Sequence, residues 1–306
     1  MRLALVALRR VLFVAAIGGA ALISVRCQAD EPLRWKFKAG EAFDYQWTRD
    51  MNLNVDAGRA GQMATFTEQT MNMTWSVRSV DDQGDAVIEQ KIGRVRMTMA
   101  MPGGQGFDYD TDSEEPAVGM AAMIAPTLKA MTAGELSFTM SPRGEIRDVE
   151  ISDELAESLK HGPGGETGAV EQFKSMVSQV AFALPENPPQ IGETWTTKLA
   201  VSSPTGGSQT VETTYTYDGT READGTTFAV IKPRVTLELA DNRMMEMKMK
   251  EQKTDGEVLF DPQAGQLHSM SVNQNITLDV VVAGQTMPGT IDQKTDLTVT
   301  PKQDEP

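Results

Sequence analysis

The chain has 306 residues, of which 43 are acidic and 28 basic, and its formal net charge is −15 at pH 7. A surface this acidic repels nucleic acid and anionic membrane faces, so neither is expected as a partner. One cysteine is too few for a disulfide framework or a cysteine–zinc site.

Residues 1–29 have the pattern of a secretory signal peptide. Arginines precede an uncharged, largely apolar run over 11–25, which is shorter than the about 20 residues of a membrane span. Small residues at Cys27 and Ala29 fit an A-x-A-like site, which predicts cleavage after Ala29 and an exported protein, periplasmic or extracellular. Lipoprotein processing at Cys27 is the alternative, but Arg26 stands where a small residue is required.

Cleavage after Ala29 would leave a chain with no cysteine and no membrane span. The leader carries four arginines and no acid, so its removal makes the net charge four units more negative. Such a protein must be stabilised by its core, and its length suffices for one large domain or two smaller ones.

Alternation of apolar and polar residues dominates the rest of the chain and predicts strands. Each alternating run places apolar side chains on one face and polar ones on the other, which is typical of antiparallel sheets with one face in water. Turn sequences rich in Gly, Pro and Asp separate the runs. The clearest runs are 51–55, 71–77, 95–101, 235–239 and 275–282.

Helical periodicity is confined to the central segment 117–184. Helices are predicted over 117–131, 152–160 and 166–184, the last with apolar residues at spacings of three and four. The proline-rich stretch 185–190 ends the last helix and has the composition of a linker.

After this linker the chain repeats its own pattern. "GEAFDYQW" at 40–47 has a counterpart in "GETWTTKL" at 192–199, and the hairpin segments that follow also correspond. The other two pairs are 80–99 with 221–239, and 134–151 with 256–272.

The repeat divides the mature chain into two related parts. We predict a β-meander with the central helical segment over 30–184, a second β-meander over 185–302, and a disordered tail over 303–306. The expected fold is mainly β (α+β). It is either one long curved antiparallel sheet or two packed sheets, with two or three helices from 117–184 covering the apolar face.

Four features of this arrangement occur together: the exported leader, the opening "LRWKFKAGEAFDYQW", the central helical block, and the turns in "PQIGETWT" and "GEVLFDPQAGQL". In this it resembles a family of exported bacterial β-rich proteins of unknown function. The resemblance implies a fold and nominates no catalytic residue. At the level of fold alone, a long antiparallel sheet with helices against its concave face is also similar to periplasmic lipoprotein carriers, and such a likeness does not supply a function.

Methionines recur at alternate positions of three predicted strands and allow two interpretations. Thioether sulfur is a soft ligand that suits Cu(I). Met is also an adaptable apolar residue, over-used on surfaces that bind varied apolar molecules. Val, Leu and Trp hold the same positions in other strands, and neither His161 nor His268 is near a methionine group, which favours the apolar interpretation.

The preferred hypothesis is therefore an exported, non-catalytic protein that binds a hydrophobic small molecule, such as a lipid or acyl chain, with no metal and no cofactor. A methionine-based Cu(I)-binding protein and an envelope scaffold without a small-molecule site are the alternatives. The predicted binding face consists of Met71, Met73, Trp75, Met97, Met99, Met101, Met245, Met247 and Met249.

Other candidate sites are weaker. The acidic run 107–115 has the first three acidic positions of a calcium loop but lacks its glycine and its final glutamate, which favours a strand with outward acids. No nucleophile elbow, metalloprotease, phosphate-loop or dinucleotide motif is present, so no enzyme class is predicted. His268 is expected on the surface and Trp35 partly exposed. Trp47, Trp75 and Trp195 are expected to be core anchors.

Overall fold

The computed structural model describes residues 31–302, apart from 59–60, 162–169, 171–172, 175–176, 178–181, 203–207, 240–245 and 283–284. The predicted signal peptide and C-terminal tail lie outside the described residues, as does most of the predicted helix over 166–184.

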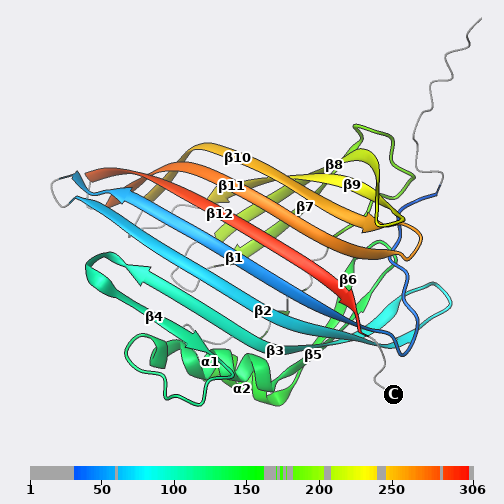
Figure 1. Ribbon diagram of the computed structural model, residues 1–306, viewed down its shortest axis with the longest axis horizontal. Helices are drawn as coiled ribbons and strands as arrows, with labels where there is room; N and C mark the ends of the chain where they lie inside the picture. The colour runs from blue at the N-terminus through cyan, green and yellow to red at the C-terminus, as the bar shows by residue number, and fades with distance from the viewer. Residues whose placement is uncertain are drawn as a thin grey trace, which may run out of the picture.

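Long strands make up most of the described chain (Figure 1). A short 3-10 turn (Pro102–Gly104) follows β3. The elements in chain order are β1 (Ala42–Asp56), β2 (Gln62–Val80), β3 (Ala86–Met101), β4 (Gln105–Asp110), α1 (Ala121–Ala133), β5 (Glu135–Met140), β6 (Ile146–Ile151), α2 (Asp153–His161), β7 (Thr194–Ser202), β8 (Ser208–Ala223), β9 (Thr226–Leu239), β10 (Glu246–Asp261), β11 (Gln266–Val282) and β12 (Gln285–Pro301).

All of these strands join one antiparallel sheet. Its order is β6-β5-β3-β2-β1-β12-β11-β10-β9-β8-β7, and β4 pairs with the part of β3 that β5 does not reach. The sheet curves and does not close, so β6 and β7 are its edges (Figure 1). The predicted mainly β fold is confirmed, and of the two arrangements expected, one continuous sheet is the observed one.

Helices cover part of the apolar face, as expected from the sequence. In α1, Ala121, Ala125 and Leu128 pack against Val95 of β3 and Tyr109 of β4. This helix begins later than predicted and continues through Pro126.

The second helix, α2, starts at a serine cap. The hydroxyl of Ser152 accepts the N–H of Leu155 at 3.4 Å, which satisfies one of the free donors of the first turn. Of the third predicted helix, residues 170, 173, 174 and 177 are described as helical, and Phe173 and Val177 pack against the main core. Residues 182–184 are described and are not helical, so the helix ends before its predicted end at 184.

The two parts that the sequence repeat predicts share the geometry of their first turn. Gly40 (φ +90°) donates its N–H to the carbonyl of Val77 at 2.9 Å, and Gly192 (φ +86°) donates to that of Tyr217 at 2.8 Å. In each turn the glutamate after the glycine accepts the N–H of the residue three positions earlier at 2.9 Å. A register shift follows Val77 in β2 and Tyr217 in β8. The duplication itself stays a prediction, which these matched turns support.

One end of the curved sheet is closed by two chain segments, and we call it the closed end. Residues 33–37 run between two hairpin turns, because Trp35 donates its N–H to Pro142 (2.8 Å) and Lys36 donates to Gly265 (3.0 Å). Residues 182–186 lie alongside, with Leu184 donating to the carbonyl of Arg143 at 2.8 Å. The hairpins β5–β6 and β10–β11 are well separated in the strand order, so only a curved sheet can bring both turns to one segment.

The closed end contains the aromatic core, and there one expectation is wrong. Trp35 is 3% exposed, not partly exposed, because it stacks on Phe37 and meets Phe260 edge-on at 5.5 Å. Its charged sequence neighbours point away from it on alternate positions of an extended segment. Trp75 and Trp195 are half-buried against the same core, as expected of anchors.

The ladder between β9 and β10 is short. It covers three pairs and ends at Ile231 with Val258. Two residues further along β9, Pro233 has no N–H to donate, so a regular ladder cannot continue there. Gly256 lies opposite, and a Cβ on it would come within 3.1 Å of the Pro233 ring.

Beyond Pro233, the backbone of β9 forms hydrogen bonds with side chains of β10 instead of with the β10 backbone. The hydroxyl of Thr254 accepts the N–H of Val235 at 3.2 Å and donates to its carbonyl at 3.1 Å. The amide of Gln252 likewise accepts the N–H of Leu237 at 2.7 Å and donates to its carbonyl at 2.8 Å. The strands therefore stay joined although their backbones have separated.

Candidate ligand-binding face

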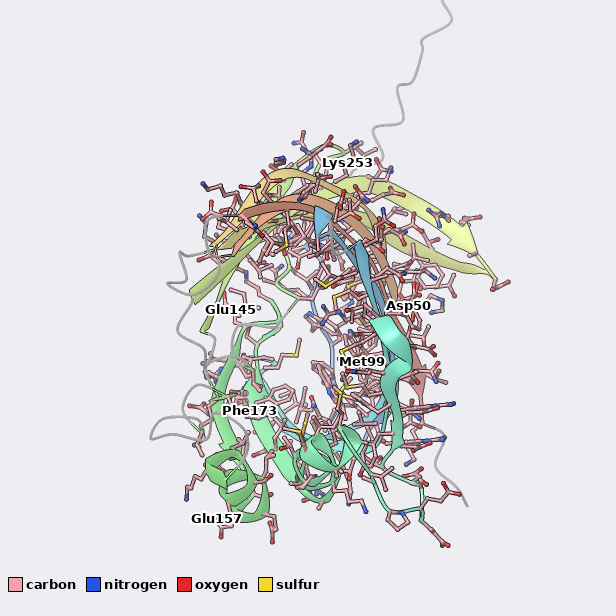
Figure 2. All side chains as sticks on the ribbon, turned by 90° about the vertical axis from the view of Figure 1, so that its left-hand side faces the viewer. Asp50, Met99, Glu145, Glu157, Phe173 and Lys253 are labelled. Atoms are coloured by element: carbon pink, nitrogen blue, oxygen red, sulfur yellow. The ribbon has the colours of Figure 1, made fainter. Side chains whose placement is uncertain are left out.

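The inner, concave face of the sheet follows from the register of its strands. Met51 of β1 lies opposite Thr67 of β2 and Gln293 of β12, so these three side chains share a face with their neighbours two residues away. This is also the face on which α1 and residues 33–37 pack. Figure 2 shows Met99 on the inside of the curve and Asp50 and Lys253 on the outside.

Most of the predicted binding residues do lie on the concave face. Met71, Met73, Trp75, Met97, Met99, Met101 and Met249 are all half-buried. Met245 and the side chain of Met247 lie outside what the structure describes.

These residues do not form one cluster. Met71 and Met73 pack with the α1 cluster, whereas Met249 packs with Val55 and Leu278 at the end of the sheet away from the closed end. We call that end the far end. Half-buried apolar side chains from several strands line the face there, and they include Met51, Leu53, Leu237, Met287 and Ile291.

A polar band crosses the concave face between the aromatic closed end and the apolar far end. Arg49 donates from Nε to the side-chain oxygen of Gln293 at 3.0 Å, and from Nη2 to the sulfur of Met51 at 3.4 Å. Gln293 in turn donates to Gln274 of β11 at 3.1 Å and to Thr295 at 3.4 Å. The band thus joins three adjacent central strands.

Arg49 is an unusual residue for this face. On the central strands β3, β2, β1, β12, β11 and β10, Arg49 is the one charged side chain among the described residues that the register places on this face. Burial lowers its pKa from the usual value, because desolvation disfavours the charged guanidinium. No described carboxylate forms an ion pair with it, and its partners are a neutral amide and a thioether.

Arg49 is absent from the predicted site because the alternating run recognised in the sequence begins at Met51. The signal was present: the apolar alternation begins at Phe43 and continues through Tyr45 and Trp47, which places Arg49 on the apolar face. A charged residue in phase with apolar neighbours is the pattern that could have identified it.

The outer face has a different chemistry. A depression of about 600 Å³ lies over the central strands there, and its lining carries charges of both signs, with Asp50, Asp292, Lys253 and Lys294 among them. Such a lining suits ions and water and does not suit an acyl chain.

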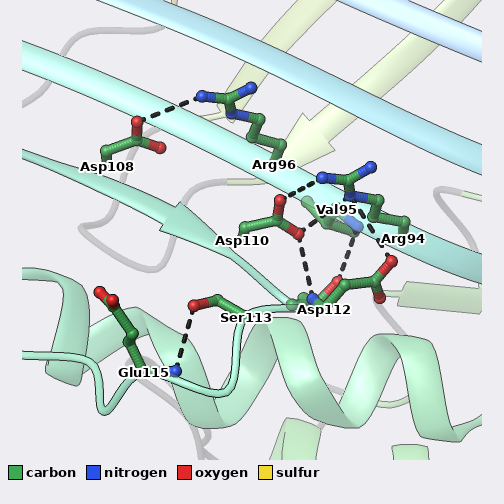
Figure 3. A network of polar contacts seen from close by, with 9 residues as sticks. Arg94, Val95, Arg96, Asp108, Asp110, Asp112, Ser113 and Glu115 are labelled. Atoms are coloured by element: carbon green, nitrogen blue, oxygen red, sulfur yellow. Dashed lines mark hydrogen bonds and ion pairs between the residues drawn. The ribbon is translucent and has the colours of Figure 1, made fainter.

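The acidic run considered for calcium is engaged with arginines on this outer side (Figure 3). Asp110 pairs with Arg94, and Asp108 lies 3.3 Å from Arg96. The hydrogen bond from Arg94 is the largest contribution that lowers the pKa of Asp110. Asp112 lies 3.6 Å from Arg94, so all three aspartates have cationic neighbours.

The described residues contain no group of three or more His, Cys, Asp or Glu side chains placed to hold a metal ion. They also contain no helix that is both long enough and apolar enough to span a membrane. His268 is exposed, as expected, and stacks on Phe228 at a centroid distance of 4.6 Å.

Comparison with known proteins gives one family and a loose fold likeness. Residues 83–169 match the family described as "Family of unknown function (DUF6263)", which confirms over that stretch the expected resemblance to a family without known function. No curated protein matches the chain.

Among solved structures, the chain is similar to one of lipovitellin, described as "lipid-protein interactions in lipovitellin" (TM-score 0.49, 14% identity, 89% of this chain and 26% of that one). It is also similar to a Nitrosomonas europaea protein assigned provisionally as AttH (TM-score 0.19, 11% identity, 86% of this chain and 53% of that one). The chain thus spans about a quarter and about half of those chains. Likeness at these scores carries no argument about function, and the likeness to lipoprotein carriers stays a prediction.

Proposed function

We propose that this is an exported, non-catalytic protein that binds a hydrophobic ligand, such as a lipid or acyl chain, on the concave face of its sheet. The observation that carries the proposal is the half-exposed apolar lining of the far end. A curved face lined by Leu53, Met249 and Ile291, without any described acid, keeps apolar area in contact with water. An exposed apolar surface of this kind marks a binding site more often than a plain exterior. Export rests on the leader over 1–29.

The energetics require that the ligand covers much of this lining. Each methylene removed from water contributes about 0.8 kcal/mol. About ten methylenes therefore supply ~8 kcal/mol, which is similar to the about 4–15 kcal/mol lost as translational and rotational freedom on association. An acyl chain against the far end would bind, but weakly, unless its headgroup also contributes.

Native mass spectrometry of the protein purified from its own host tests the proposal. We expect a co-purifying mass of a lipid or fatty acid. A copper adduct that is lost when Met97, Met99 and Met249 are changed to Leu would favour the metal-binding alternative. Protein that carries neither would favour an envelope scaffold.

A matched pair of variants locates the site. Leu53→Lys places a cation on the concave face of β1, and Asn52→Lys places the same cation on its outer face one residue away. We expect the first to release the co-purifying ligand and the second to retain it, with circular dichroism confirming that both are folded. Equal retention by both variants would contradict a site on the concave face.

A further inference from the structure

The concave face has the charge pattern of a site for an amphiphile and not for a purely apolar molecule. On the central strands β3, β2, β1, β12, β11 and β10, the register places none of the described acidic residues on this face, whereas one cation, Arg49, lies in its middle. The acids of β1 itself, Asp44, Asp50 and Asp56, lie on the outer face. The chain thus has many carboxylates, but no described carboxylate forms an ion pair with Arg49.

Arg49 differs from the six described arginines that pair with a carboxylate, and it differs from Arg34, which binds backbone carbonyls. Arg49 is held by Gln293 and Met51, neither of which carries charge. A thioether is a weak acceptor, so the guanidinium keeps N–H donors available for a planar oxyanion. Arginines that pair with a carboxylate are Arg78, Arg94, Arg96, Arg143, Arg147 and Arg221.

The strand next to β1 carries a buried polar group that has no hydrogen-bond partner. Thr67 of β2 lies opposite Met51, diagonally across from Arg49, and is 8% exposed. Its hydroxyl oxygen has no hydrogen-bond partner in the structure. A buried polar atom without a partner is costly and uncommon in native proteins, and a bound group that hydrogen-bonds to it removes that cost.

We propose that Arg49, supported by Gln293 and with Thr67 beside it, binds the oxyanion headgroup of a single-chain amphiphile whose tail lies against the apolar far end. This inference rests on the proposed function and names the class of its ligand. The geometry suits it because the polar band borders the far end directly: from Arg49, the next concave residues along β1 are Met51, Leu53 and Val55. A carboxylate or phosphate can accept two parallel hydrogen bonds from the guanidinium, and such charge-assisted bonds are about twice as strong as neutral ones.

Binding of four probes to the full chain, after removal of bound lipid, tests the headgroup. Dodecanoate and dodecyl phosphate carry the oxyanion and the tail, dodecanol carries the tail alone, and acetate carries the oxyanion alone. We expect at least one of the two anionic amphiphiles to bind about tenfold or more tighter than dodecanol, which corresponds to ~1.4 kcal/mol. Which of the two binds tighter identifies the source of the oxyanion. Equal binding of acetate and dodecanoate would overturn the proposal, because it would show a site for free anions.

Variants assign the preference to Arg49. In Arg49→Met the anionic amphiphiles should lose their advantage over dodecanol, while the affinity for dodecanol stays within about twofold. Arg78→Met removes the same charge from the outer face of β2 and should keep the full advantage. Should Arg49→Met not fold, Arg49→Gln removes the charge and keeps a hydrogen-bonding side chain, and the same loss is expected.

The outcomes separate this inference from the proposed function. An advantage for anions that survives in both Arg49 variants overturns the role of Arg49. Equal binding of dodecanol and both anionic amphiphiles by the unaltered chain overturns the inference but leaves a hydrophobic-ligand protein. Failure of all three amphiphiles to bind overturns the proposed function and this inference with it.

Discussion

Two glycines with the same backbone conformation offer a test of how the closed end is built. Gly144 (φ +87°) and Gly192 (φ +86°) both occupy the left-handed region, where an alanine costs about 1–2 kcal/mol. Their surroundings differ. A Cβ on Gly144 would lie 2.3 Å from the carbonyl oxygen of Phe182 and 2.8 Å from the indole nitrogen of Trp35, whereas a Cβ on Gly192 would meet nothing within 4 Å.

Gly144→Ala should therefore destabilise the protein far more than Gly192→Ala. The indole N–H of Trp35 donates to the carbonyl of Phe182 at 3.3 Å, and the new methyl group would separate the two. Loss of this hydrogen bond costs about 0.5–1.5 kcal/mol. The methyl group also displaces buried Trp35, so we expect a total of about 3–5 kcal/mol for Gly144→Ala. Gly192→Ala should cost only the backbone strain of about 1–2 kcal/mol.

Equilibrium unfolding in urea, followed by tryptophan fluorescence and by circular dichroism, measures both changes. The slope of the unfolding free energy against urea concentration should be the same in the unaltered protein and in both variants, because the surface exposed on unfolding does not change. Equal losses for the two variants would refute the reasoning, since they would mean that residues 182–186 do not pack on the turn at Gly144.

Two further outcomes follow from other contacts. Gln252→Leu removes both hydrogen bonds to Leu237 and should cost about 1–3 kcal/mol and accelerate amide exchange at Leu237, whereas exposed Lys253→Ala on the other face should do neither. Asp110→Asn should be less stable than the unaltered chain at pH 7, and the difference should fade as pH falls below about 4. The reason is that a carboxyl whose pKa is lowered on folding stabilises above its unfolded pKa and loses that effect on protonation. A difference that persists at pH 2 would show that the Arg94 hydrogen bond is not its cause.

The sheet was predictable because its signal is local and repeated. Residues 95–101 alternate with period two, and the structure places Val95, Met97 and Met99 on one face. Glycine turns at 40 and 192 start strands in both halves, as the repeated Gly-Glu predicted. Alternating residues do not show how strongly a sheet curves. Whether the strands form one sheet or two packed sheets therefore depends on tertiary contacts, such as the hydrogen bond from Trp35 to Pro142.

The pairing of strands across the sheet, and not the pattern within one strand, decides which polar residues come together in the candidate site. Arg49, Thr67 and Gln293 are distant in sequence and become neighbours only through the ladders of β1 with β2 and β12. The same holds for the methionines. Their positions in the sequence show which face of a strand they lie on, but not which cluster of side chains they join. Met71 packs under α1, whereas Met249 packs with β11.

The two parts of the chain differ where a strand separates from its neighbour: β3 from β5 in the first part, and β9 from β10 in the second. β3 parts from β5 after Lys91, β4 pairs with β3 beyond that point, and α1 covers the concave face there. β9 parts from β10 after Ile231, and side chains of β10 bridge the gap instead. One side of the concave face is therefore covered by α1, and no described helix covers the other side. A tail directed from Arg49 toward β10 and β11 would meet apolar side chains there without displacing α1.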